Sequence, residues 1–214
     1  AKLDYDDPET YKMLSRGETE GVFQLESSGM KQVLVGLQPQ NLEDVIALIS
    51  LYRPGPMDSI PTYLRNRHEP DKISYKTPQL AHILDVTNGC IVYQEQVMQI
   101  FRELAGFSFG QADNVRRAMS KKKHAVMEAE REHFVHGCTE PGHECPGCVA
   151  NGISEEVANE IYDEMSSFAS YAFNKSHAAC YAVVGYQTAW LKAHYPVEFM
   201  AALMTSVMDN AAKV

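Results

Sequence analysis

The densest positive charge in this sequence lies between Val115 and Lys123, which reads Val-Arg-Arg-Ala-Met-Ser-Lys-Lys-Lys. The whole chain is acidic, with 28 Asp and Glu residues against 19 Lys and Arg residues. A protein that coats DNA nonspecifically tends to be basic, so this composition argues against that class. Cations gathered in one place of an acidic chain predict an anion site, for nucleic-acid phosphates or a nucleotide triphosphate. The alternative is that the lysines form a solvated helix end, where the helix dipole favours cations.

A second polar cluster, residues 170–177, reads Ser-Tyr-Ala-Phe-Asn-Lys-Ser-His and lies between two predicted helices. Such a break exposes backbone N–H groups, which suit an anion. Lys175 and His177 add hydrogen-bond donors, and Tyr171 and Phe173 offer flat faces to a sugar or base. An ordinary N-cap at Ser176 or Asn174, with both rings in the core, is the alternative.

Arg53 follows an apolar segment and precedes Pro54-Gly55-Pro56. The rigid turn holds the arginine at a fixed angle, which suits a phosphate ligand. A surface arginine at the end of a helix is an equally simple interpretation.

The segment 136–149 is rich in cysteine and histidine and contains Cys-Pro-Gly-Cys, a tight turn that can present two thiolates to one ion. We predict a structural zinc site, because this glycine- and proline-rich loop has almost nothing apolar to hold it. A redox Cys-x-x-Cys pair and reduced surface thiols are the alternatives. The expected ligands are Cys138, Cys145, Cys148 and His143, with His136 as the next choice for the fourth position.

No catalytic set is evident. The sequence has no convincing pair of carboxylates, no P-loop, no nucleophile elbow and no dinucleotide fingerprint. The residues therefore indicate a nucleotide- or phosphate-binding unit without its own catalytic machinery.

The hydrophobic pattern is mainly helical, and 214 residues with 45% hydrophobic content can form one large or two small domains. No signal peptide or apolar run of about 18 residues is present, so we expect a cytoplasmic, non-membrane protein. Both ends look like cuts within a longer protein.

Residues 57–90 are expected to be irregular and proline-rich, with strand-like stretches at 73–75 and 90–93. The charged helix at 125–136 is expected to be exposed. The other expected helices run over residues 8–16, 28–37, 42–53, 94–104, 155–168 and 177–194, with a last one from 197. A further expected helix carries Ala112, Val115 and Met119.

Six motifs occur here in an order that closely resembles the fingers region of the alpha subunit of bacterial DNA polymerase III, over nearly the whole chain. They are Gly21-Val-Phe-Gln-Leu-Glu-Ser-Ser-Gly29, Leu51-Tyr-Arg-Pro-Gly-Pro56, Ile91-Val-Tyr-Gln-Glu-Gln-Val-Met98, Arg116-Arg-Ala-Met-Ser-Lys-Lys-Lys123, Phe173-Asn-Lys-Ser-His177 and Tyr186-Gln-Thr-Ala-Trp-Leu-Lys-Ala-His-Tyr-Pro196. The resemblance implies one largely helical fingers domain over residues 1–214. The cysteine and histidine spacing adds the prediction of a small zinc-loop insertion at 136–149 within it. Many members of the family lack that insertion, so the zinc prediction depends on the spacing in this chain.

The resemblance also implies a role in template-directed DNA synthesis, since fingers close over the incoming dNTP and the primer-template. The nucleotide-binding residues would be Arg116, Arg117, Tyr171, Asn174, Lys175, His177 and Arg53, and the lysines at 121, 122 and 123 (Lys121, Lys122, Lys123) would lie on DNA phosphates or in solvent. The palm aspartates that hold Mg²⁺ precede this region in the family, so the fragment alone should not polymerise DNA. Palm, thumb and other replisome subunits would be partners. A competing hypothesis is a zinc-stabilised helical interaction module of the replisome, in which the basic run is incidental.

Overall fold

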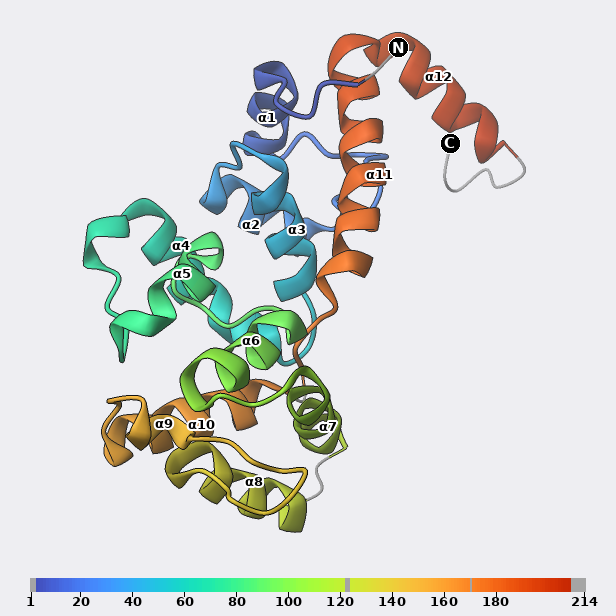
Figure 1. The fold of residues 1–214 in the computed structure, drawn as a ribbon. Helices are drawn as coiled ribbons and strands as arrows, with labels where there is room; N and C mark the ends of the chain where they lie inside the picture. Colours follow the sequence, from blue (N-terminus) through green and yellow to red (C-terminus); the bar gives the residue numbers. More distant parts are fainter. Residues whose placement is uncertain (1–2, 122–123, 170, 209–214) are drawn as a thin grey trace. The chain divides into compact units, whose positions relative to one another are not determined.

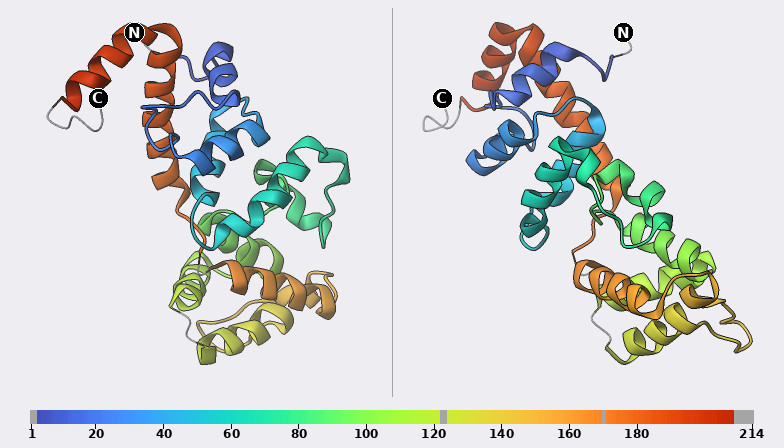
Figure 2. Two further views of the ribbon diagram at one scale, coloured as in Figure 1. Left: turned by 180° about the vertical axis from the view of Figure 1, so that it is seen from behind. Right: turned by 90° about the vertical axis from the view of Figure 1, so that its left-hand side faces the viewer.

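The computed structural model describes residues 3–121, 124–169 and 171–208. Within these ranges the chain forms α-helices, short 3₁₀ helices and two isolated β-bridges, and no strand (Figure 1). It divides into two compact units, one made of Ala1–Tyr52 with Ser176–Val214 and the other of Arg53–Lys175. Figure 2 shows the same helices from two further sides. The prediction of a mainly α-helical protein is confirmed.

The first unit contains five helices, and their ends follow from local capping. They are α1 (Pro8–Ser15), α2 (Ser28–Leu37), α3 (Leu42–Leu51), α11 (Lys175–His194, all but its first residue) and α12 (Pro196–Ser206). The Asp7 carboxylate accepts from the Thr10 N–H at 2.9 Å, and the Asn41 side chain accepts from the Asp44 N–H at 3.0 Å. Each side chain satisfies a backbone donor that the first turn leaves open, so both helices begin where the sequence predicts.

The N-terminal part of the first unit packs against helix α11. Tyr186 is fully buried, its hydroxyl donates to the Asp4 carbonyl at 3.0 Å, and its ring lies 5.4 Å from that of Tyr11. Two residues further along α11, the Thr188 hydroxyl accepts from the Phe23 N–H at 3.0 Å.

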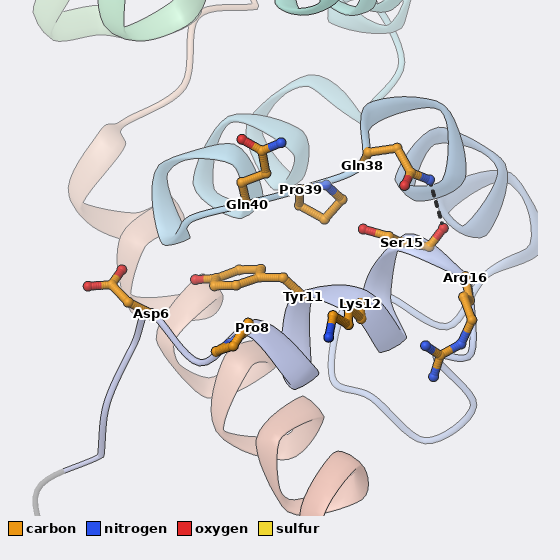
Figure 3. A pocket seen from close by; sticks show the side chains of 9 residues that line it. All are labelled: Asp6, Pro8, Tyr11, Lys12, Ser15, Arg16, Gln38, Pro39 and Gln40. Atoms are coloured by element: carbon orange, nitrogen blue, oxygen red, sulfur yellow. Dashed lines mark hydrogen bonds between the residues drawn. The ribbon is translucent and has the colours of Figure 1, made fainter.

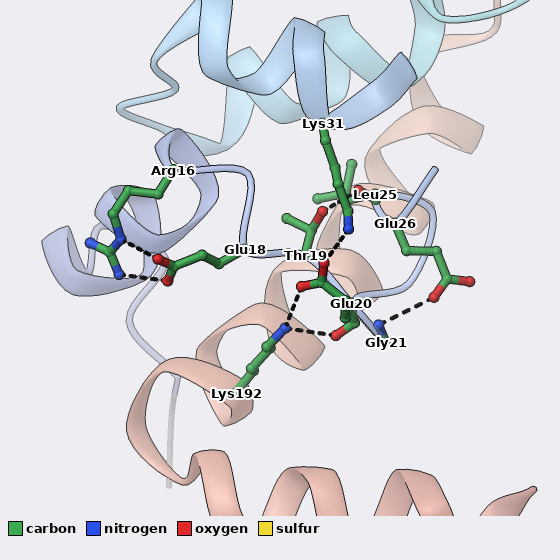
Figure 4. A network of polar contacts seen from close by, with 9 residues as sticks. All are labelled: Arg16, Glu18, Thr19, Glu20, Gly21, Leu25, Glu26, Lys31 and Lys192. Carbon is green, nitrogen blue, oxygen red and sulfur yellow. Dashed lines mark hydrogen bonds and ion pairs between the residues drawn. The ribbon is translucent and has the colours of Figure 1, made fainter. Parts of the chain in front are cut away.

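Ion pairs fix the loop 17–26 to α2 and α11 (Figure 4). Glu20 pairs with Lys31, and Lys192 donates to the Glu20 carbonyl at 2.9 Å. The hydrogen bond from Lys31 lowers the pKa of Glu20 to about 2. Because this pKa is lowered on folding, the carboxylate stabilises the unit above its ordinary pKa, and this contribution is lost as the pH falls toward 2. The pair is exposed, so its contribution is below about 1 kcal/mol.

A hollow of about 510 Å³ lies in the same unit, between α1 and residues 38–40. Figure 3 shows Pro8 and Tyr11 on one side of it and Pro39 and Gln40 on the other. Its cations, Lys12 and Arg16, are each paired with a neighbouring glutamate at 2.7 and 2.8 Å. We assign it no ligand.

The second unit surrounds α6 (Gln94–Ala105). Phe101 is fully buried there, with its ring 5.2 Å from Phe107, 5.1 Å from Phe134 and 6.0 Å from Tyr162. These rings come from the segment after α6, from α8 (His124–His136) and from α10 (Glu155–Ala169). The remaining elements of this unit are Pro56–Ser59 (η1), α4 (Ile60–His68), Pro70–Lys72 (η2), Pro78–Leu80 (η3), α5 (Ala81–Leu84), Asp85–Thr87 (η4), α7 (Phe109–Ser120) and α9 (Gly147–Ala150).

Three local expectations from the sequence differ from the structure. Helix α8 is not exposed on all sides, since Phe134 and Val135 at its C-terminal end are buried in the core. The segment 57–90 contains α4, a nine-residue helix with Pro61 in its first turn, where a proline interrupts no hydrogen bond. The strand-like stretches form no strand in the described residues; Tyr93 makes one isolated bridge. None of the described helices combines the length and the apolar character that a membrane crossing needs.

Candidate functional site

Two of the segments that the sequence analysis selected meet in the second unit. Tyr93 and Phe173 form an isolated parallel bridge, in which the Gln94 N–H donates to the Phe173 carbonyl at 3.0 Å. The Phe173 N–H donates to the Val92 carbonyl at 3.3 Å. The bridge places the start of α6 beside the polar segment 171–175.

Arg116 reaches this bridge from α7. Its Nη1 donates to Gln94 Oε1 at 3.0 Å, and Gln94 Nε2 donates to the Ala172 carbonyl at 3.0 Å. Arg116 Nη2 also donates to Asp113 Oδ1 at 2.8 Å, and 19% of its side chain is exposed. Arg116 is thus held against the segment 171–175 through Gln94.

Arg117 shares the same carboxylate but faces outward. Its Nε donates to Asp113 Oδ2 at 2.7 Å, and 64% of its side chain is exposed. The hydrogen bond from Arg116 and the charges of both arginines hold the pKa of Asp113 below its ordinary value. The spacings of three and four residues put all three side chains on one helix surface.

Arg53 contacts the segment 171–175 directly. Its Nη2 donates to the Tyr171 carbonyl at 2.8 Å, and its guanidinium carbon lies 4.0 Å from the centre of the Phe173 ring. The Tyr171 ring lies against Gly55, where a Cβ atom would come within 2.4 Å of the ring, and 45% of this tyrosine is exposed. The rigid turn Pro54-Gly55-Pro56 therefore contacts the Tyr171 ring through Gly55.

Lys175 lies on the other side of the bridge. Its ammonium group is 5.2 Å from the centre of the Tyr93 ring, and its backbone N–H donates to both oxygens of Glu95, at 3.1 and 3.2 Å. At the break where the sequence predicts backbone N–H groups for an anion, the Lys175 N–H thus already donates to a carboxylate of the protein. Asn174 is exposed beside it.

Comparison with known proteins identifies the family of this chain. Residues 1–142 match the family described as the bacterial DNA polymerase III alpha subunit finger domain. The chain belongs to this family. Over the whole chain it is 52% identical to DNA polymerase III subunit alpha of Thermus aquaticus, 47% to that of Bacillus subtilis strain 168 and 48% to that of Pasteurella multocida. It spans only 17 to 18% of the length of these relatives.

Other predicted site residues of the finger domain are found elsewhere in the chain or lie outside the described residues. His177 belongs to the first unit, where its ring lies 4.4 Å from that of Tyr181. Lys121 is exposed at the end of α7, and Lys122 and Lys123 lie outside the described residues. The sequence patterns did not identify Gln94, Glu95 and Asp113. The motif at 91–98 contains the first two, but nothing local in it shows which residues they contact.

The Cys/His loop of the finger domain is closed by backbone contacts. Cys138 and Cys145 exchange two N–H···O bonds of 2.9 Å, and a Cβ atom on Gly147 would lie 2.3 Å from the Gly137 nitrogen. Cys148 is fully buried, and burial raises its pKa to about 12. His136 and His143 are exposed. No three His, Cys, Asp or Glu side chains converge on a metal position in the described part of the chain, so the predicted zinc loop is not confirmed.

Proposed function

We propose that this finger domain binds the triphosphate of the incoming dNTP during template-directed DNA synthesis by the full-length alpha subunit. One observation carries the proposal: Arg116 on α7 is linked at the bridge of Tyr93 with Phe173 to the segment 171–175, which carries both Tyr171 and Lys175. The relatives are named DNA polymerase III subunit alpha, so the reaction would be nucleotidyl transfer by a DNA-directed DNA polymerase in the cytoplasm.

In this proposal the cations act by electrostatics. Arg116 and Arg117 contact the triphosphate and stabilise the charge that develops as pyrophosphate leaves. Lys175 and His177 approach the phosphates, with Asn174 beside them, and Tyr171 lies against the sugar. Arg53 holds the segment that carries this tyrosine. In the full-length subunit, the palm would bind the Mg²⁺ ions. Palm, thumb and replisome subunits are the proposed protein partners.

The dNTP dependence of single-nucleotide incorporation by the full-length subunit tests the proposal. A nucleotide-binding role of the two arginines predicts that their replacement raises the KM for dNTP while the Kd for primer-template stays unchanged. A change confined to the Kd for DNA would assign this surface to the template instead.

Primer-template DNA is the second proposed ligand, with Lys121, Lys122 and Lys123 on its phosphates. Replacing all three by Ala in the full-length subunit should weaken DNA binding about equally for all sequences. Because each phosphate contact releases about 0.9 counterion, the slope of log K against log salt should become shallower by up to about 3. The measurement is a salt titration of binding by fluorescence anisotropy, with Lys72→Ala in another exposed segment as the control. An unchanged slope would place the lysines in solvent.

A structural zinc ion in the loop 136–149 is also proposed, as in the competing hypothesis of a zinc-stabilised interaction module. The pairing of Cys138 with Cys145 and the close approach of Gly137 to Gly147 gather three thiols on one short loop. Three thiols with a histidine, His143 or His136, form a donor set that suits Zn²⁺. Binding would require the thiol groups to turn toward a common point.

Elemental analysis of the purified full-length subunit should therefore give about one zinc that depends on this loop. Cys145→Ser should remove that zinc, whereas Cys180→Ser, at an exposed site on α11, should not. Chelation should release zinc and increase the number of thiols that react with an alkylating reagent. Equal zinc content in both variants would contradict the proposal.

A further inference from the structure

Gln94 contacts both halves of the proposed nucleotide site. Its backbone N–H donates to the Phe173 carbonyl, and its side chain contacts Arg116 on one side and the Ala172 carbonyl on the other, each at 3.0 Å. We propose that Gln94 is a positioning residue, which sets Arg116 relative to the segment 171–175. This inference rests on the proposed function.

The chemistry of the two contacts requires an amide. A guanidinium group has only donors, so the atom facing Arg116 must accept, and this assigns the amide oxygen to that side. The Ala172 carbonyl only accepts, so the amide NH₂ group must face it. A glutamate of the same length would lose the donor, and a methionine of nearly the same shape would lose both contacts.

The bonds between Arg116 and Asp113 do not make this link. Asp113 lies on the same helix, so its bonds to Arg116 orient the guanidinium on α7 without relating it to the segment 171–175. Loss of the Gln94 side chain removes the hydrogen bonds that link Arg116 to the Ala172 carbonyl, while Arg116 keeps its charge and its bond to Asp113. Charge stabilisation in an active site depends on such fixed geometry.

The test is a double-mutant cycle in the full-length subunit, with Gln94→Met and Arg116→Ala, read as kcat and KM for dNTP. Gln94→Met alone should raise the KM about tenfold, in line with loss of a hydrogen bond to a charged group. In the Arg116→Ala background it should change the KM less than about twofold, because a residue that acts through Arg116 has nothing left to position. The matched control is Gln99→Met, also on α6, whose amide donates within the same helix to Glu103 at 2.7 Å.

The outcomes separate the two proposals. If Arg116→Ala leaves the KM unchanged, the proposed function fails. If Arg116→Ala raises the KM but Gln94→Met does not, or if the two losses multiply, only the positioning role is overturned. Thermal unfolding of each variant identifies a general loss of folding, and a Gln94→Met enzyme with full stability and a raised KM supports the positioning role.

Discussion

Replacing Arg116 and Arg117 together by Ala is expected to raise the KM for dNTP of the full-length subunit about 100-fold. Hydrogen bonds to charged groups contribute about 1.5 kcal/mol or more each, and 1.4 kcal/mol corresponds to a factor of ten. The double change also leaves the Asp113 carboxylate without its two arginines. An uncompensated negative charge beside the proposed triphosphate position would add repulsion, so the effect should exceed that of either single change.

The control for this double change is Arg102→Ala, which removes an exposed arginine on α6 whose guanidinium lies 5.9 Å from the Phe109 ring. Its KM for dNTP should stay within about twofold of the wild-type value. If the double variant is as stable as the wild type and has the same KM, the basic surface of α7 does not bind the nucleotide. The competing hypothesis, in which the basic run is incidental, would then be favoured.

Helix boundaries were predictable from the sequence because capping is local. Asp7 and Asn41 satisfy donors only three residues away, so their role can be identified without knowing the fold. Two elements were not predictable in this way. Helix α4 contains Pro61, which suggests a break unless it falls in the first turn, and the buried side of α8 depends on where Phe101 and Tyr162 lie.

For the candidate site, too, local features were predictable from the sequence and long-range contacts were not. Charged and aromatic residues in recognisable motifs identified Arg116, Lys175 and Tyr171 as candidates. Their arrangement depends on the bridge between Tyr93 and Phe173, which are far apart in the sequence. Before that bridge is known, Gln94 is one amide among several, and nothing in its neighbourhood indicates that it joins α7 to the segment 171–175.

Carboxylates of the protein already contact the cations and the backbone donor of the proposed anion site. Asp113 holds both arginines, and Glu95 holds the Lys175 N–H. A triphosphate that binds here must compete with two carboxylates of the protein itself. A carboxylate carries less charge than a triphosphate, so the exchange can favour the nucleotide while the cations remain ordered in its absence.

Gly55→Ala is expected to disturb the site through the backbone. Gly55 has φ +102°, a conformation that side chains rarely adopt, and its Cβ atom would lie 2.4 Å from the Tyr171 ring. The strain should lower the free energy of unfolding by about 1–3 kcal/mol. Displacement of Tyr171 should in addition raise the KM for dNTP, by about tenfold if the ring lies against the sugar.

Two matched glycines separate these causes in the full-length subunit. Gly152 has φ +83° but nothing within 4 Å of the added atom, so Gly152→Ala should cost stability without changing the KM. Gly110→Ala, in α7 with open space around it, should be neutral or stabilising by up to about 1 kcal/mol. Chemical denaturation and dNTP titration of the three variants measure both quantities. A Gly55→Ala variant that loses stability but keeps its KM would show that the position of Tyr171 does not matter for the nucleotide, because the strain would then act on folding alone.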